Sequence, residues 1–308
     1  MRMKIGIGIG DIGGAPADVN GMVAQAKRAE ADGFASAWLA NIFGFDAIML
    51  AALCARETTR IELGTAVVPT FPRHPVVMAQ QALTAQGALG GRFTLGIGLS
   101  HKVMMEDAMG IPYERPAAHM REYLSVLAPL LRGEPVSFHG EQYKVETTVV
   151  VADAAPVPLV VAALGPAMLR LAGQFADGTI TSWVGPKTLE SHTIPGIRAA
   201  ADEAGRPAPR ILVGLPIELT SDEANARERV AERSAWYNTL PSYRSMLDIE
   251  GAEGPADIAL VGDDASLRRQ LGRLRDAGTT DLLAQIVTSE PGSPARTLAF
   301  LAEYAKES

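Results

Sequence analysis

The sequence contains a single cysteine among its 308 residues. Cys54 has no second thiol in the chain to pair with, which excludes a disulfide framework within it. The thiol lies in an apolar segment with helical spacing, 47–57. We therefore interpret Cys54 as an unreactive thiol of the hydrophobic core.

Basic residues and long apolar runs are also scarce. Lysine and arginine number 28 against 35 aspartates and glutamates, a net charge of −7, so we expect no nucleic-acid partner. The longest apolar runs, such as Ala47–Ala55, are much shorter than the roughly 20 residues that span a bilayer. The first ten residues, MRMKIGIGIG, contain no apolar signal core. We expect a cytoplasmic protein with no membrane partner.

Several signatures of protein-borne catalysis are missing. None of the five histidines pairs with another histidine, a cysteine or a carboxylate at the spacing of a metal motif such as HExxH, so we expect no metal. A Walker A sequence and a GxSxG elbow are absent as well. A chain without these groups favours chemistry performed by an organic cofactor.

Short apolar segments alternate with segments of helical period along the chain. Strands are predicted at 4–9, 34–39, 61–68, 92–97, 158–161, 178–181, 210–218 and 281–286. Helices are predicted at 16–31, 46–57, 74–89, 116–131, 167–175, 187–204 and from 293, with a long polar and helical stretch over 221–275. Repeated strand–helix units require a parallel sheet, and eight of them close a (β/α)8 TIM barrel. The alternative is an open doubly wound sheet with a helical second domain.

The length fits a barrel with additions, since such barrels take about 250 residues. We expect one domain over residues 1–308, with insertions near 99–116, 133–157 and 240–262. Within the second insertion, residues 136–151 are predicted to form a hairpin. The third is interpreted as a surface insertion.

Gly8 to Gly13 match the dinucleotide fingerprint GxGxxG directly after a strand. That fingerprint also needs a helix starting at its third glycine and an acidic residue at the end of the second strand. Here the helix is predicted to start near Pro16, and strand two ends in Asn41 without a carboxylate. We therefore interpret the glycines as a tight barrel strand followed by a loop.

The carboxyl ends of barrel strands form the active site in this fold. His101 follows Gly98-Leu99-Ser100 at one such end and is a candidate proton donor, although a solvated loop histidine is the alternative. Asn41, at the exit of strand two, is a candidate hydrogen-bond donor to a ligand. The loop 162–165 leads into a helix amino terminus, which can bind an anion, or is an ordinary turn.

Four segments resemble the luciferase-like family of flavin and deazaflavin barrel enzymes. They are LGTAVVPTFPRHP (63–75, followed by Ala79-Gln80), GRFTLGIG (91–98), FHGEQY (138–143) and PLVVAALGP (158–166, followed by 176–178). Within the family, the sequence is most similar to coenzyme F420-dependent oxidoreductases, through GTAVVPTFPRHP and GLSH.

This resemblance implies a non-proline cis peptide at Ala66–Val67, behind the central ring of the cofactor. It also implies that the loop 162–165 holds the cofactor phosphate and that His101 stands where some members carry an acidic proton donor. Asn41 stands where sugar-phosphate dehydrogenases carry histidine preceded by aspartate; here Ala40 precedes it, which argues against that activity. The expected catalytic residues are His101 and Asn41. The expected cofactor-binding residues are Gly8, Asn41, Ala66, Val67, Gly98, Ser100, Ala162, Ala163, Leu164, Gly165 and Thr181.

Three functions remain open on this basis. The first is hydride transfer between F420 and a small organic substrate, and the second is an FMN-dependent two-component monooxygenase. The third is a non-catalytic barrel, for which bulky side chains should fill the strand ends. We expect the Met-rich loop 104–109 and the 240–262 insertion to shape the substrate pocket, and we expect a homodimer.

Overall fold

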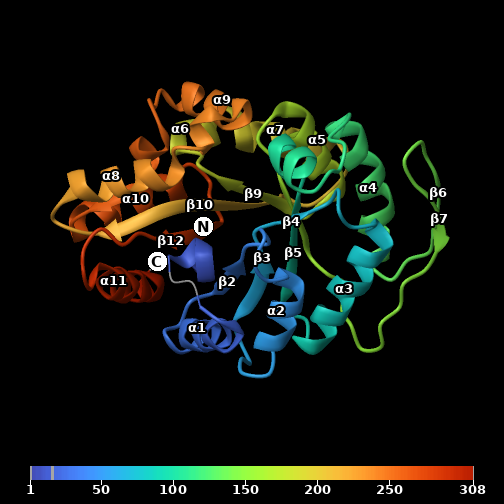
Figure 1. Cartoon of the computed structure of the whole chain (residues 1–308), viewed down its shortest axis with the longest axis horizontal. Coiled ribbons are helices and arrows are strands. Elements are labelled where there is room, and N and C mark those ends of the chain that lie inside the picture. Colours follow the sequence, from blue (N-terminus) through green and yellow to red (C-terminus); the bar gives the residue numbers. More distant parts are fainter. Residues whose placement is uncertain (1, 15–16, 308) are drawn as a thin grey trace.

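The structure, a computed structural model, describes residues 2–14 and 17–307. Parallel strands close into a barrel in the order β10-β12-β1-β2-β3-β5-β8-β9, and β9 pairs back to β10 with Gly178 opposite Arg210 (Figure 1). This closure confirms the TIM barrel and excludes the open sheet. The barrel strands are β1 Lys4–Ile9, β2 Ser36–Leu39, β3 Glu62–Thr65, β5 Phe93–Gly98, β8 Leu159–Ala162, β9 Gly178–Ser182, β10 Arg210–Leu219 and β12 Asp281–Ile286.

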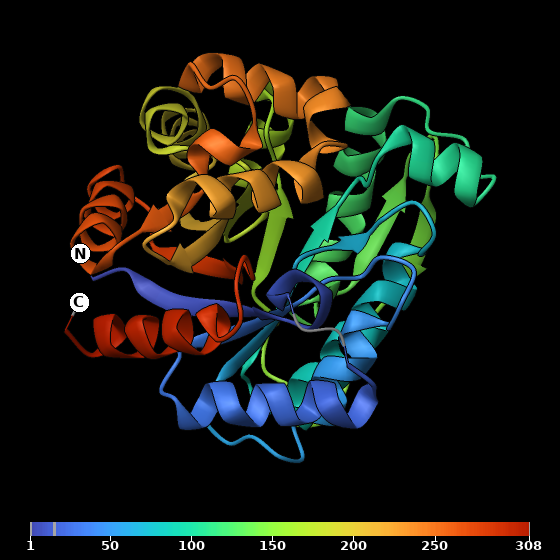
Figure 2. The same cartoon turned by 60° about the vertical axis from the view of Figure 1, so that its left-hand side comes forward.

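Helices surround the barrel. They are α1 Val19–Ala31, α2 Ala47–Cys54, α3 Pro75–Ala88, α4 Pro116–Leu130, α5 Pro166–Phe175, α6 Pro186–Thr188, α7 Ile194–Glu203, α8 Glu223–Ser234, α9 Pro241–Glu250, α10 Asp264–Asp276 and α11 Ser293–Glu307. Figure 2 shows α11 beside β1, so the two ends of the chain lie close together. Within residues 2–14 and 17–307, no helix combines the length and apolar character that a membrane crossing requires.

Helix boundaries follow their capping residues. Asp18 caps α1 by accepting from the Gly21 amide, and Asp46 caps α2 by accepting from the Met49 amide. The predicted start of the first helix at Pro16 lies outside the described residues. Cys54 ends α2 and is buried as expected, and burial raises the pKa of its thiol to about 12.

The segment 221–275 differs from the prediction. It is not wholly helical, because Leu260–Gly262 form a short strand, β11. This strand pairs in parallel with the last residues of β10, beyond those that pair with β9. Gly262 ends β11 with a φ of 142°, a left-handed conformation that favours glycine. The short 3-10 turn Tyr237–Thr239 and helix α9 precede β11.

The predicted hairpin is present as β6 Val136–His139 paired with β7 Lys144–Thr147. Figure 1 shows it at the edge of the molecule, beside α4. The Glu122 carboxylate of α4 accepts hydrogen bonds from three successive amides at the tip of the hairpin, those of residues 141–143, at 2.8–3.2 Å. Charge-assisted bonds of this kind attach the insertion firmly to the barrel wall.

One strand of the barrel has an extra residue. Gly64 lies opposite Thr94 of β5, but Val68, which begins the short strand β4 Val68–Pro69, lies opposite Ile97. Three residues therefore face two, which is a β-bulge. The Thr65 side chain fills the gap in the ladder: its Oγ1 accepts from the Gly96 amide and donates to the Gly96 carbonyl, both at 2.8 Å. The expected cis peptide at Ala66–Val67 lies in this bulge and is confirmed.

An apolar cluster fills the lower interior of the barrel. It contains Trp38, Val160, Ile180, Leu212 and Leu283, one from each of five strands. Gly64 makes room for the indole, because a Cβ there would lie 2.2 Å from the Trp38 ring. The cluster gives the barrel a solid floor, so the space above it opens only at the carboxyl ends of the strands.

Below this floor, the guanidinium of Arg210 crosses the amino-terminal end of the barrel. It contacts the Glu62 carboxylate of β3 at 2.6 Å and the Asp281 carboxylate of β12 at 2.6 Å. The guanidinium also lies 5.7 Å from the centre of the Trp38 ring. Burial opposes the charge, but the hydrogen bonds to Asp281 and Glu62 outweigh it and raise the pKa of Arg210.

We expect Arg210→Gln to destabilise the fold by about 3 kcal/mol or more, because it leaves the buried carboxylate of Asp281 and the partly buried carboxylate of Glu62 without their cation. Arg206→Gln is the control, since Arg206 pairs with the half-exposed Asp177 at 3.0 Å and should cost no more than about 1 kcal/mol. Urea unfolding of both variants measures the difference. Equal losses would show that the Arg210 network contributes no more than a surface ion pair.

Candidate active site

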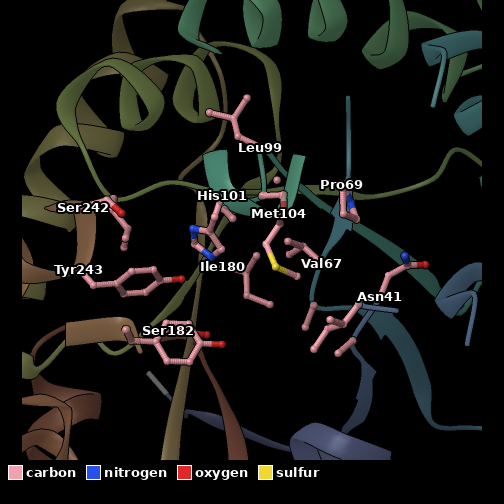
Figure 3. Close-up of a pocket in the computed structure, with 18 of the residues that line it drawn as sticks. Asn41, Val67, Pro69, Leu99, His101, Met104, Ile180, Ser182, Ser242 and Tyr243 are labelled. Atoms are coloured by element: carbon pink, nitrogen blue, oxygen red, sulfur yellow. The ribbon is translucent and has the colours of Figure 1, made fainter. Parts of the chain in front are cut away.

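A cavity of about 600 Å³ lies at the carboxyl ends of the strands. This volume is typical of a small-molecule or cofactor site. Figure 3 shows Val67, His101, Met104 and Ile180 around its centre, with Asn41 and Ser242 towards opposite sides. Met104, Met105 and Met109 of the Met-rich loop line the cavity, as do Ser242 and Tyr243 of the 240–262 insertion.

The bulge forms one wall of this cavity. Ala66 and Val67 line it together with Gly98 of β5. A Cβ at Gly98 would lie 2.8 Å from Val67 Cγ2, so glycine is required for the bulge to sit against β5. These expected cofactor residues therefore form one continuous apolar surface.

The loop before α5 forms a second wall. Ala162, Ala163, Leu164 and Gly165 all line the cavity. Gly165 caps α5 without a side-chain bond, and nothing lies within 4 Å of the position that its Cβ would take. Pro166, the first residue of α5, has no N–H, but the amides of Ala167 and Met168 have no partner within the helix and lie at its positive dipole end, so this wall can bind an anion.

His192, which sequence reasoning missed, holds this loop. Its Nε2 donates to the Leu164 carbonyl at 2.7 Å. A second unpredicted histidine, His119 of α4, stacks on Phe71 at 3.9 Å and bonds through Nε2 to Thr70 Oγ1 at 3.1 Å. Both histidines position loops of the cavity and neither lines it.

His101 lies at the cavity, where it packs among aromatic rings. Its ring centre is 4.9 Å from that of Trp236 and 5.8 Å from that of Tyr243. Ser100, just before it, has a φ of 62°, an uncommon conformation for a residue other than glycine that turns the chain at this strand end. Burial lowers the pKa of His101 below 6.5. His101 is thus a half-buried loop histidine packed on aromatic rings at the cavity, and its role as proton donor stays a prediction.

We call Trp183, Trp236, Tyr237 and Tyr243 the aromatic wall. All four line the cavity, and they come from the segments that follow β9 and β10. The centres of the Trp183 and Tyr237 rings are 5.4 Å apart. Sequence reasoning missed this wall. Its signal was three aromatic residues within positions 236–243 of a chain that is only 6% aromatic.

Asn41 lines the cavity on the side opposite the aromatic wall. Its Oδ1 accepts from the Ala47 amide at 3.0 Å and so helps to begin α2. Arg73 lies on the same side and forms an ion pair with Asp46. The bond to the Ala47 amide fixes the orientation of the Asn41 amide and leaves its NH2 group to donate to a ligand.

Two expected site residues do not reach the cavity. A Cβ on Gly8 would meet the backbone of Ile12 at 2.9 Å, so Ile12 covers Gly8 and lines the cavity in its place. Thr181 faces away from the barrel interior, where its hydroxyl donates to the Leu212 carbonyl at 3.3 Å. Successive strand residues face opposite sides, so the next residue, Ser182, lines the cavity instead.

Within the described part of the chain, no three His, Cys, Asp or Glu residues lie close enough together to hold a metal ion.

Known proteins resemble this chain along its whole length or over its larger part. The 5,10-methylenetetrahydromethanopterin reductase of Methanopyrus kandleri is 32% identical over 58% of this chain. F420-dependent glucose-6-phosphate dehydrogenases of Nakamurella multipartita and Beutenbergia cavernae are 30% and 32% identical over 73% and 71% of it. The matched regions span 56% to 66% of the length of these relatives.

Solved structures share the fold over 98% of the chain. An F420-dependent secondary alcohol dehydrogenase in complex with an F420-acetone adduct superposes with a TM-score of 0.81 at 19% identity. The oxygenating constituent of 3,6-diketocamphane monooxygenase from Pseudomonas putida, in complex with FMN, superposes with a TM-score of 0.77 at 17% identity. The family model described as luciferase-like monooxygenase matches residues 3–307. The chain therefore belongs to the luciferase-like monooxygenase family.

Proposed function

We propose that this protein is an F420-dependent oxidoreductase that transfers a hydride between the deazaflavin and a small organic substrate. The observation that carries the proposal is the β-bulge that contains Ala66 and Val67, both of which line an open cavity at the strand ends. The relatives named F420-dependent dehydrogenases and the structure that holds an F420-acetone adduct support the same cofactor.

The residues of the cavity fit such a cofactor. Ala66, Val67 and Gly98 offer an apolar surface for a flat ring system. The start of α5 offers the amides of Ala167 and Met168 to a phosphate, and Gly165 leaves the space before them open. Bound F420 would supply a donor or acceptor of hydride at one carbon of its ring. Met104 and the aromatic wall line the cavity beside this surface.

His101 carries the proton in this proposal. Reduction of a carbonyl leaves an oxygen that must be protonated, and the imidazolium Nδ1 or Nε2 can supply that proton. In the reverse direction, the neutral imidazole takes the proton of an alcohol. Ser182 and Tyr243 also line the cavity and can orient the substrate oxygen through their hydroxyl groups.

An FMN-dependent monooxygenase is the second candidate function, because the FMN-bound structure has the same barrel. Titration of the purified protein with each cofactor, followed by fluorescence, separates the two. We expect tighter binding of F420; micromolar binding of FMN without binding of F420 would favour the monooxygenase. The non-catalytic barrel is disfavoured, because the strand ends enclose an open cavity instead of bulky side chains.

We also propose that two copies of the chain form a homodimer through α2. Every residue of this helix is apolar, yet Met49 and Leu53 are exposed to 66% and 42%. A helix that is apolar on all sides is usually covered. Light scattering of the purified protein gives the molecular mass; a monomer at all concentrations would contradict this proposal.

The first prediction concerns Gly165. Gly165→Asp places a carboxylate before the amides of α5, so we expect F420 to bind more weakly by about 2 kcal/mol or more, roughly 30-fold. Aspartate is a favourable helix cap, so the fold should persist. Gly165→Ala is the matched control, because φ is −81° and the space before Gly165 is open. Unchanged affinity in a folded Gly165→Asp protein would remove this loop from the cofactor site.

The second prediction concerns His101. His101→Ala should lower kcat at least tenfold while the affinity for the cofactor changes far less. Burial lowers the pKa of His101, so its acidic form is abundant only below pH 6.5. In the reducing direction, kcat should therefore fall as the pH rises, with a midpoint below 6.5, and the variant should lose this dependence. A variant with full turnover and an unchanged pH profile would refute the role of His101 as proton donor.

A further inference from the structure

The two sides of the cavity differ in chemistry. The aromatic wall follows β9 and β10, whereas Asn41 and Arg73 follow β2 and β4. β3, which leads into β4, and β10 stand four places apart in a barrel of eight strands, so they lie on opposite sides of it. His101 follows β5 and packs edge-to-face on Trp236 of the aromatic wall, with ring planes at 86°. We call the side of the cavity that the aromatic wall lines the aromatic half. A substrate at His101 therefore lies in the aromatic half.

Apart from His101, the half of the cavity lined by the aromatic wall offers a substrate no acidic or basic side chain from the described residues. Among the described residues that line the cavity there is no aspartate or glutamate, and Arg73 is the one lysine or arginine. Its guanidinium is already paired with Asp46, on the opposite side of the barrel. A phosphate or carboxylate beside the aromatic wall would lose its hydration and could gain no cation other than His101, whose neutral form burial favours by lowering its pKa; such a loss is strongly unfavourable.

The aromatic wall is fixed in place by side chains outside the cavity. The Glu250 carboxylate, at the end of α9, accepts from the Thr188 amide at 2.7 Å and from the Thr188 hydroxyl at 2.8 Å. Arg244 of α9 donates to the Ala252 and Glu253 carbonyls, both at 2.7 Å. The Glu250 bonds hold α9, which carries Tyr243, against the segment after β9, and the Arg244 bonds fix the chain that follows α9 against the helix, so a substrate meets a preformed surface.

Trp236 is the part of this surface that a ligand reaches most readily. Its side chain is 40% exposed although it packs on His101 and on Tyr237, with the Tyr237 ring 5.3 Å away. An exposed aromatic face at the mouth of a cavity gains free energy when an apolar ring covers it. Ser182, Ser242 and Tyr243 add neutral hydroxyl groups to the same half.

We propose that the substrate is an uncharged, largely apolar cyclic ketone, or the matching secondary alcohol, whose ring packs on Trp236 and Tyr243 with its oxygen towards His101. This inference rests on the proposed function. In the reducing direction, the carbonyl carbon accepts a hydride from the reduced deazaflavin as the C=O π bond breaks. The oxygen then takes one proton from the His101 imidazolium. The ketone is reduced by two electrons and the deazaflavin is oxidised by two.

Calorimetric titration of the purified full-length protein tests the substrate class without any turnover. The probes are 2-decalone, an uncharged bicyclic ketone, and glucose 6-phosphate, each titrated without cofactor and again with F420 added. We expect 2-decalone to bind at least tenfold more tightly than glucose 6-phosphate, with and without F420. Tighter binding of glucose 6-phosphate, or displacement of 2-decalone by F420, would overturn the inference.

Trp236→Ala localises the binding, and Trp236→Phe is its matched control because it retains an aromatic face. We expect Trp236→Ala to weaken 2-decalone binding at least tenfold and Trp236→Phe to weaken it less than threefold. Equal affinity in the wild-type protein and Trp236→Ala would overturn the inference. The proposed function is tested separately, by the titration of the wild-type protein with F420. If the protein binds F420 but prefers glucose 6-phosphate to 2-decalone, only the proposed substrate class is refuted.

Discussion

One guanidinium, that of Arg210, fixes the closed end of the barrel. It joins the carboxylates of Glu62 and Asp281 from strands on different sides of the barrel and lies close to the Trp38 ring. The indole in turn supports the apolar cluster that fills the interior. Because this end is filled and cross-linked by charge, the cavity can open only at the other end, where the strand-end loops supply its walls. The position of the candidate site thus follows from an interaction that never touches it.

At the open end, the cavity has a backbone side and a side-chain side. The backbone side consists of the bulge at Ala66–Val67 and the loop before α5, where glycine and alanine leave main-chain atoms accessible. The side-chain side is the aromatic wall. His101 stands against the aromatic wall and faces the backbone side across the cavity. A cofactor bound through its ring and phosphate suits the first side, and a variable substrate suits the second.

The periodicity of the sequence predicts the barrel because the spacing of apolar residues in each strand and helix follows from which of its sides is buried. Local signals do not show which residue of a strand end faces the cavity, and two predictions are wrong for this reason. Thr181 was predicted to bind the cofactor, but its neighbour Ser182 faces the cavity because successive residues of a strand face opposite sides. Gly8 was also predicted to bind the cofactor, but Ile12 covers it. The aromatic wall depends on tertiary contacts between segments after different strands. Trp183 and Trp236 are more than fifty residues apart in the sequence, and no spacing rule links either of them to His101.

Apart from the bond that the Thr188 hydroxyl donates to Glu250, the attachment of α9 uses the main chain of its partners. Glu250 binds the amides of Lys187 and Thr188, and Arg244 binds the carbonyls of Ala252 and Glu253. Amides and carbonyls are the same in almost every residue type, so these bonds place little demand on the neighbouring side chains. Residues of the segment that face the cavity, such as Trp236 and Ser242, can therefore be exchanged while the segment stays in place. A barrel built in this way can acquire a new substrate by changing the lining of one loop, with its cofactor side and its closed end left as they are.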